Sequence, residues 1–187
     1  MKASEVKKLV MNAKSAVIMT DRDGRQWLGD GRYFFAADDS LPLNEDNVLA
    51  VLDVDKDKRD KIRCTQAAAF DPRMTIMPDE EHDVKLTPRM SVYYGDEMIT
   101  IMTSDDNELF GVRQSAIRPA NAKYGLAFFA RRREGMIPWI VCFEDMFATA
   151  ILMPEPARAI AAIVEGMQDI MPYKIVSYET REDAEEA

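Results

Sequence analysis

The sequence predicts an α+β protein in which antiparallel sheets are accompanied by about three helices. Short runs of apolar and β-branched residues recur through the 187 residues and are separated by tight-turn signals such as Asp-Gly. Helical spacing of apolar residues is confined to a few segments, chiefly the first segment and the one after Pro156. Strands joined by short turns, without helical crossovers, are typical of antiparallel sheets.

The first half of the chain begins with a helix. Val6, Leu9 and Val10 recur at helical spacing, and Ser4 is the expected N-cap. The elements expected after it are strands over residues 16–20 and 25–35, a short helix over 44–52, a charged, solvated helix or turn over 53–61, and irregular or edge-strand chain over 65–88. Within the second strand, Gly29-Asp30-Gly31 predicts a bulge or a further turn.

The second half of the chain is richer in strands. The expected elements are a three-stranded meander within residues 90–112, strands over 124–131, 138–143 and 146–153, a helix over 156–171 and a short strand over 174–178. The proline-containing segment before residue 88 predicts a boundary there. It would separate an N-terminal α+β lobe, residues 1–88, from a C-terminal lobe of antiparallel sheet plus helix, residues 89–187. One continuous domain is the alternative.

Composition favours a protein of a reducing compartment. A chain of this length buries about two-thirds of its unfolded surface, so it needs no disulfide or metal to fold. The two cysteines lie far apart and predict no disulfide framework. No apolar run approaches the roughly 20 residues that span a bilayer, and the basic, amphipathic N-terminus lacks the apolar core of a signal peptide. We therefore expect a cytoplasmic location and no membrane partner.

Catalytic and metal-binding motifs are not found in the sequence. His82 is the only histidine, so a histidine-rich zinc site is excluded, and Cys64 and Cys142 form no CxxC pair. A calcium-loop start at residues 53–57 fails because Lys58 stands where a glycine must turn the chain. We expect no cofactor, no metal and no enzymatic activity. An enzyme that gathers His82 with Cys64 or with acidic partners in one pocket stays open as an alternative.

Basic residues form the candidate binding site. The formal net charge of −9 argues against nonspecific nucleic-acid binding over the whole surface, yet cations are concentrated in two regions. Such groups can hold phosphates without reading a sequence. The candidate nucleic-acid-binding residues are Lys7, Lys8, Lys14, Arg113, Arg118, Arg131, Arg132 and Arg133. The alternative is that they form the solvated face of a helix and of a hairpin turn.

One family resemblance is carried by residues 98–156. ITIMTSDDNELFGVRQSAIRPA, YGLAFFARRR and PWIVCFEDMFATAILMPEP follow one another there, and the closing Ile151-Leu152-Met153-Pro154 is the most suggestive element. This order of hairpins and the terminal Met-Pro pair resembles a domain of the DNA sliding clamps, the family of bacterial β clamps and phage processivity factors. In the N-terminal half, WLGDGRYFFAADDSLPL is similar to small prophage proteins from the neighbourhood of replication genes.

The resemblance implies a clamp-like, non-enzymatic protein of phage or mobile-element type that takes part in DNA replication. Such a protein encircles double-stranded DNA as a homo-oligomer, and its helices carry basic residues toward the phosphates. Lys7 and Lys8 match that role, whereas the helix over 156–171 contains Glu165 and Asp169 and departs from it. The alternative function is a protein–protein interaction module that makes no DNA contact, with exposed methionines such as Met146 as its adaptable surface.

Overall fold

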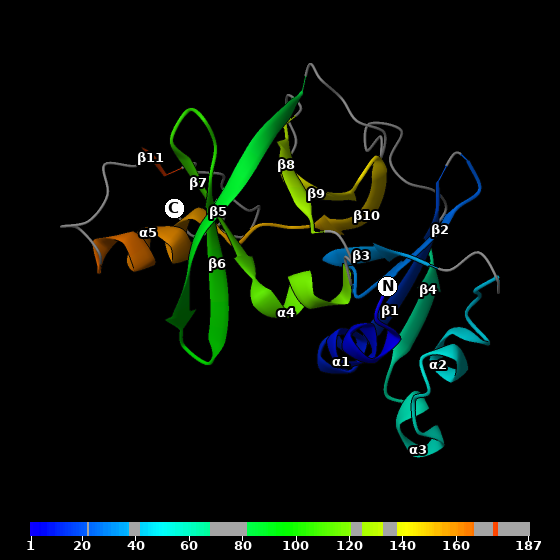
Figure 1. The fold of residues 1–187 in the computed structure, drawn as a ribbon. Coiled ribbons are helices and arrows are strands. Elements are labelled where there is room, and N and C mark those ends of the chain that lie inside the picture. The colour runs from blue at the N-terminus through cyan, green and yellow to red at the C-terminus, as the bar shows by residue number, and fades with distance from the viewer. Residues whose placement is uncertain are drawn as a thin grey trace, which may run out of the picture.

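The α+β class is confirmed by the structure, a computed structural model shown in Figure 1. It describes residues 1–21, 23–37, 42–67, 82–120, 125–132, 138–166 and 174–175, and every structural statement below refers to these residues. The strands are β1 (Ser15–Thr20), β2 (Gln26–Gly29), β3 (Tyr33–Ala36), β4 (Arg63–Gln66), β5 (Asp83–Tyr94), β6 (Glu97–Thr103), β7 (Glu108–Arg113), β8 (Ala127–Arg131), β9 (Trp139–Glu144), β10 (Phe147–Leu152) and β11 (Lys174–Ile175). The helices are α1 (Ala3–Ala13), α2 (Val48–Val51), α3 (Lys56–Arg59), α4 (Gln114–Ile117), the 3₁₀ turn η1 (Arg118–Ala120) and α5 (Ala157–Glu165).

The described strands join in the order β11-β7-β6-β5-β8-β9-β10-β3-β2-β1-β4. Most neighbours are antiparallel, as expected, and the two parallel pairs, β1 with β4 and β7 with β11, lie at the ends. β5 belongs to two sheets, because residues 83–86 pair with β8 whereas residues 87–94 pair with β6. Sheet A consists of β4, β1, β2, β3, β10, β9, β8 and residues 83–86 of β5, in that order. Sheet B consists of residues 87–94 of β5 with β6, β7 and β11.

The predicted boundary at residue 88 falls inside β5. Strands β8, β9 and β10, from the second half of the chain, continue the sheet that β1, β2 and β3 begin, with Ala150 opposite Phe35. A register shift between Pro88 and Met90 marks the point where β5 leaves sheet A for sheet B. The described strands therefore divide by their pairing and not in chain order.

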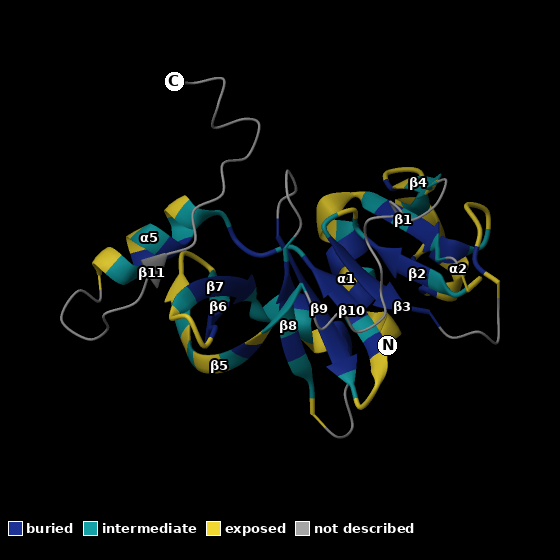
Figure 2. Ribbon diagram, turned by 90° about the horizontal axis from the view of Figure 1, so that it is seen from above, coloured by how far each residue is buried: buried dark blue, intermediate teal, exposed yellow. Residues whose placement is uncertain are grey.

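The central strands of sheet A are buried on both faces. Successive side chains point to opposite sides of a strand, so the consecutive buried residues of these strands belong to two cores. Leu28 and Phe35 face one core with the apolar side of α1, whereas their neighbours Trp27 and Phe34 face a second, aromatic core. The dark interior strands and paler rim of Figure 2 show this arrangement. The continuous apolar runs in β3 and β9 follow from this double burial.

Helix α5 covers one face of sheet B. Ile160 and Ile163 of α5 pack on Ile99 and Ile101 of β6. Gly111 of β7 permits this close approach, because an added Cβ would lie 2.1 Å from the Cδ1 of Ile160. The expected helix over 156–171 is therefore confirmed as far as residue 165, and residues 167–171 lie outside the described part.

Several local expectations need correction. The Ser4 cap is wrong: α1 begins at Ala3 after Lys2, whose backbone N–H donates to the carbonyl of Pro119 (2.8 Å). The single strand expected over 25–35 is two strands, β2 and β3, and of the two alternatives at Gly29-Asp30-Gly31 the turn is confirmed. Helices α4 and η1 were not expected, so the described residues hold more than three helices.

Candidate interaction surfaces

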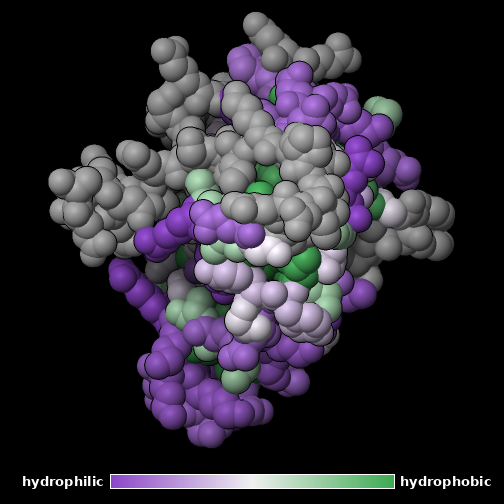
Figure 3. Space-filling model, turned by 90° about the vertical axis from the view of Figure 1, so that its left-hand side faces the viewer, coloured by the Kyte–Doolittle hydropathy of each residue, from purple (hydrophilic) through white to green (hydrophobic). Residues whose placement is uncertain are grey.

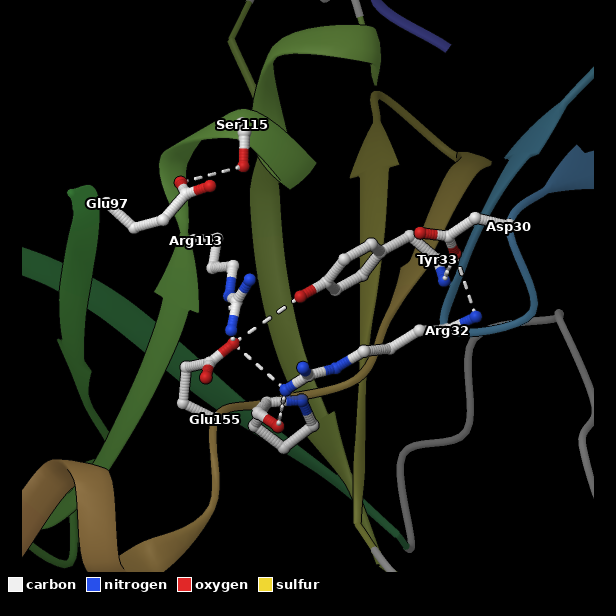
Figure 4. Close-up of polar contacts among 8 residues, drawn as sticks. Asp30, Arg32, Tyr33, Glu97, Arg113, Ser115 and Glu155 are labelled. Atoms are coloured by element: carbon white, nitrogen blue, oxygen red, sulfur yellow. Dashed lines mark hydrogen bonds and ion pairs between the residues drawn. The ribbon is translucent and has the colours of Figure 1, made fainter. Parts of the chain in front are cut away.

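A buried glutamate joins sheet A to sheet B. Glu155 follows β10 and is 4% exposed. Its Oε1 accepts hydrogen bonds from Arg32 Nη2 (2.9 Å), Arg113 Nε (2.9 Å) and Tyr33 Oη (3.4 Å). Figure 4 shows the three side chains converging on it from the β2–β3 turn and from β7. We call Glu155, Arg32, Tyr33 and Arg113 the Glu155 junction.

The backbone around the Glu155 junction is fixed locally. The Asp30 carboxylate accepts the backbone N–H groups of Arg32 and Tyr33, both at 2.8 Å, which closes the β2–β3 turn. The backbone N–H of Glu155 donates to the carbonyl of Gly111 in β7 (2.8 Å). The backbone that carries Arg32, Tyr33 and Glu155 is therefore fixed by hydrogen bonds of its own, in addition to the contacts between the side chains.

The Glu155 junction has the chemistry of a structural contact between the two sheets. Burial raises the pKa of the Tyr33 phenol, so the hydroxyl stays protonated and donates its hydrogen bond. Burial is the largest single effect and lowers the pKa of Arg113, but the hydrogen bond to Glu155 and the charges of Glu155, Tyr33 and Glu97 together outweigh it, so the net shift is upward. One carboxylate oxygen already accepts three donors, which suits positioning better than proton transfer.

Three predicted nucleic-acid-binding arginines are used in ion pairs inside the protein. Arg131 is fully buried and holds Asp83 through two hydrogen bonds of 2.6 and 2.7 Å. Arg132 binds Glu108 (2.9 Å), and Arg113 belongs to the Glu155 junction. Arg131 joins the neighbouring strands β8 and β5, whereas Arg132 and Arg113 join segments that are not neighbours in a sheet. Because all three are engaged within the protein, we leave them out of the candidate DNA surface. Arg133 lies outside the described residues.

Two predicted cations from distant parts of the chain come together beside α1. The exposed Lys8 binds Glu5 (2.8 Å), and Arg118 of η1 lies close enough to act on the same carboxylate. The pKa of Glu5 is lowered first by the hydrogen bond from Lys8 and then by the charges of Lys8, Arg118 and Lys2, against a smaller opposing effect of desolvation. We call Lys2, Lys8 and Arg118 the α1–η1 basic cluster. Sequence reasoning missed Lys2.

The remaining two predicted lysines lie apart from this cluster. Lys7 contacts the backbone carbonyl of Asp53, with its carboxylate 3.6 Å away. Lys14 is exposed at the end of α1, where its φ of 54° ends the helix. Lys7 therefore anchors α1 to the chain after α2, and Lys14 alone adds an exposed charge.

The two cysteines lie on well-separated strands of sheet A. Cys64 lies in β4 and Cys142 in β9, and strands β1, β2, β3 and β10 separate them in sheet A. Burial raises the pKa of both thiols. Within the described ranges no group of three His, Cys, Asp or Glu side chains is placed to hold a metal ion. Of the acidic segment 79–83, only His82 and Asp83 are described.

The turn between β9 and β10 exposes two large apolar side chains. Met146 is 82% exposed and Phe147 is 70% exposed. Asp145, with a φ of 55°, makes the turn and is itself exposed. We call residues 145–147 the β9–β10 tip. The sequence indicated Met146 through its methionine content. It gave no signal for Phe147, because the apolar residues around it predict an ordinary strand.

The second exposed feature is the outer edge of β5. β8 pairs only with residues 83–86, so no described strand covers the outer edge of Met90–Tyr94, which we call the β5 edge. Tyr93 is 75% exposed and Tyr94 is also exposed. Figure 2 shows β5 as the exposed outer strand of sheet B. The view toward the α5 side in Figure 3 has pale and green surface between purple regions.

Comparisons with known proteins give no relative for these surfaces. A scan against protein-family models, a search of curated proteins and a search of solved structures found no match to this chain. None of the described helices has the length and apolar character that crossing a membrane requires.

Proposed function

We propose that the protein is a non-enzymatic binding protein that docks a protein partner through the β9–β10 tip. The observation that carries this proposal is the exposure of two adjacent large apolar side chains, Met146 and Phe147, at the end of a hairpin. Moving one such side chain out of water is worth about 1.5–3 kcal/mol, so a partner pocket that buries both gains substantial affinity. Methionine and aromatic residues are also enriched in the cores of protein interfaces.

The hairpin behind the tip is held rigidly. β9 pairs with β8 and β10 pairs with β3, so both strands lie inside sheet A. Arg25 Nη1 donates to the carbonyl of Ala148 (3.0 Å), directly after the tip, and Phe143 packs edge-on against Phe129 at 5.7 Å. A surface that is ordered before binding loses little entropy when the partner docks.

The charge around the tip indicates the chemistry of the partner. Asp145 is exposed beside Met146, and Glu144 is partly exposed one residue earlier. A matching surface is an apolar pocket with a basic rim, because opposite charges at the rim guide association. The net charge of −9 adds to this preference and disfavours an anionic membrane at the same surface.

The test of this proposal is affinity capture with quantitative mass spectrometry. The Met146→Ser/Phe147→Ser variant removes the apolar surface, and Val51→Ser removes an exposed apolar side chain from α2, outside both proposed surfaces, as the control. Proteins that bind the tip are recovered with the wild type and with the control but lost with the double variant, while circular dichroism stays unchanged. An identical set of proteins from all three baits contradicts docking through the tip.

A second candidate function is DNA association of the clamp-like type. It is favoured by the α1–η1 basic cluster, in which the charges of Lys2, Lys8 and Arg118 all act on the carboxylate of Glu5. The test is a salt titration of duplex DNA binding by fluorescence anisotropy. Lys8→Glu/Arg118→Glu should weaken binding and reduce the slope of log affinity against log salt by about 2.

Lys58→Glu is the control for the DNA experiment. Lys58 is as cationic as Lys8 but lies in α3, where it pairs with Asp55 (2.6 Å). DNA affinity should therefore change little in this variant. Equal losses from both variants would point to nonspecific attraction, and an absence of binding at low salt would remove the candidate.

A further inference from the structure

No described strand pairs with the outer side of the β5 edge. Residues 90–94 pair with β6 on one side only, and Pro88 and the register shift before Met90 limit the open stretch at its start. An open strand edge is a template for a further strand, because its outward N–H and C=O groups are unpaired. The same strand carries Tyr93 and Tyr94, both exposed. A fifth strand could therefore join sheet B here.

We propose that this strand is β5 of a second copy of the chain, paired antiparallel about a two-fold axis at Val92. A two-fold pairing is self-complementary, so each residue of one copy meets a fixed residue of the other. Centring it on the middle of the open stretch places Met90 opposite Tyr94 of the second copy and Ser91 opposite Tyr93. Val92 then meets Val92.

The residues of the open stretch suit this pairing. None of the five residues from Met90 to Tyr94 is charged, so pairing buries no unpaired charge. Met90 and Val92 already pack at the edge of the sheet B core, on the face that α5 covers. A methionine opposite a tyrosine adds a favourable sulfur–aromatic contact on that face.

The charges at the two ends of the stretch argue for a second copy over an unrelated strand. Arg89 precedes the stretch and Asp96 follows it, and both are exposed. Arg89 Nε donates to Thr103 Oγ1 of β6 (2.8 Å), so it is the Nη groups of Arg89 that would meet the second copy. Antiparallel self-pairing places Arg89 of each copy beside the Gly95-Asp96 turn of the other, so two opposite-charge pairs form per dimer. A parallel arrangement would instead bring Arg89 next to Arg89. The charge pattern therefore selects the antiparallel dimer.

The interface built on five residues is small. Stable interfaces bury about 1,200–2,000 Å² in total, so pairing at this edge should give a reversible dimer whose fraction depends on protein concentration. The dimer uses residues 89–96, whereas the proposed partner surface is residues 145–147. Each can therefore fail without the other.

Sedimentation velocity over a concentration series tests the dimer by charge reversal. Arg89→Asp and Asp96→Arg should each weaken the dimer about tenfold, because each turns two attractive pairs into repulsive ones. The double variant Arg89→Asp/Asp96→Arg should restore the wild-type dissociation constant to within about threefold. A wild type that is monomeric up to about 1 mM, or a dimer indifferent to all three variants, overturns the proposal.

Disulfide trapping tests the position of the axis in a Cys64→Ser background. Only a residue on the axis lies opposite itself, at about 4.5–5.5 Å between Cα atoms, which a disulfide can bridge. Val92→Cys should therefore form a covalent dimer under mild oxidation. Met90→Cys should not, because its two copies lie roughly 13 Å apart along the strands. Equal trapping of both variants contradicts the register.

Discussion

At the scale of single residues, ion pairs between distant segments hold three of the five arginines that the sequence offered as nucleic-acid contacts. Glu155 and Arg32 are 123 positions apart, and Arg131 and Asp83 are 48 apart. Their local sequence gives no sign of a partner, so both a solvated hairpin end and a phosphate contact stayed open for Arg131. Lys8 and Arg118 show the opposite outcome, since the fold brings two predicted cations together.

Replacing Glu155 by glutamine should destabilise the protein. The variant keeps the size of the side chain but removes the charge that two arginines share, which costs about 2 kcal/mol for partly buried partners. Denaturant unfolding measures this change. Glu97→Gln is the control, because the one hydrogen bond that Glu97 accepts from the described residues is a 3.3 Å contact from Ser115, and its charge is the smallest of those that act on Arg113. This variant should change stability by less than about 1 kcal/mol. Equal effects would show that the Glu155 junction contributes no more to stability than an ordinary surface hydrogen bond.

Cys142 should make stability depend on alkaline pH. Burial raises its pKa in the folded state, so above the ordinary thiol pKa of about 8.5 only the unfolded state releases the proton. Stability from this group is present below that pH and decreases as the pH rises. The stability of the wild type relative to Cys142→Ala should therefore fall by about 2 kcal/mol between pH 8.5 and pH 10. A difference that stays constant with pH contradicts this reading.

At the scale of elements, the sequence predicts strands and turns well where the signal is local. The meander over 90–112 is confirmed as β5, β6 and β7, because its turns carry Gly95-Asp96 and Ser104–Asn107. The pairing of β1 with β4 and of β10 with β3 was not predictable, since neither pair is joined by a tight turn. The open β5 edge follows from this pairing and was equally hidden.

The β2–β3 turn should tolerate no side chain at Gly29. An added Cβ would lie 1.7 Å from the backbone oxygen of Tyr33, and backbone atoms cannot move aside. Gly29→Ala should therefore cost about 3 kcal/mol or more and displace Arg32 and Tyr33 from the Glu155 junction. Thermal unfolding and the loss of the Glu155→Gln effect in the double variant measure both consequences.

Gly24→Ala is the matched control for Gly29. Its φ of +83° strains an alanine, but no atom lies within 4 Å of the added Cβ. We expect a cost of about 1 kcal/mol, from the left-handed backbone alone. If the two variants were equally stable, close packing at Gly29 would play no part in the turn.

At the scale of the whole molecule, the α+β class was predictable and the division of the chain was not. Strand-forming runs and short turns determine the class, whereas the shared strand β5 depends on which strands become neighbours. The two surfaces that we propose for binding lie on different sheets, the β9–β10 tip on sheet A and the β5 edge on sheet B. A dimer would therefore present two identical tips, which raises the avidity for a repeated partner.

Site-specific photocrosslinking from the β9–β10 tip tests the central claim most directly. A benzophenone side chain at position 147 replaces Phe147, and the same group at the exposed Asp57 of α3 serves as the reference. Docking through the tip predicts one discrete protein adduct from position 147 that is absent from position 57 and is reduced by excess unlabelled wild type. The same adducts from both positions, or none from position 147, would contradict a protein partner at the tip.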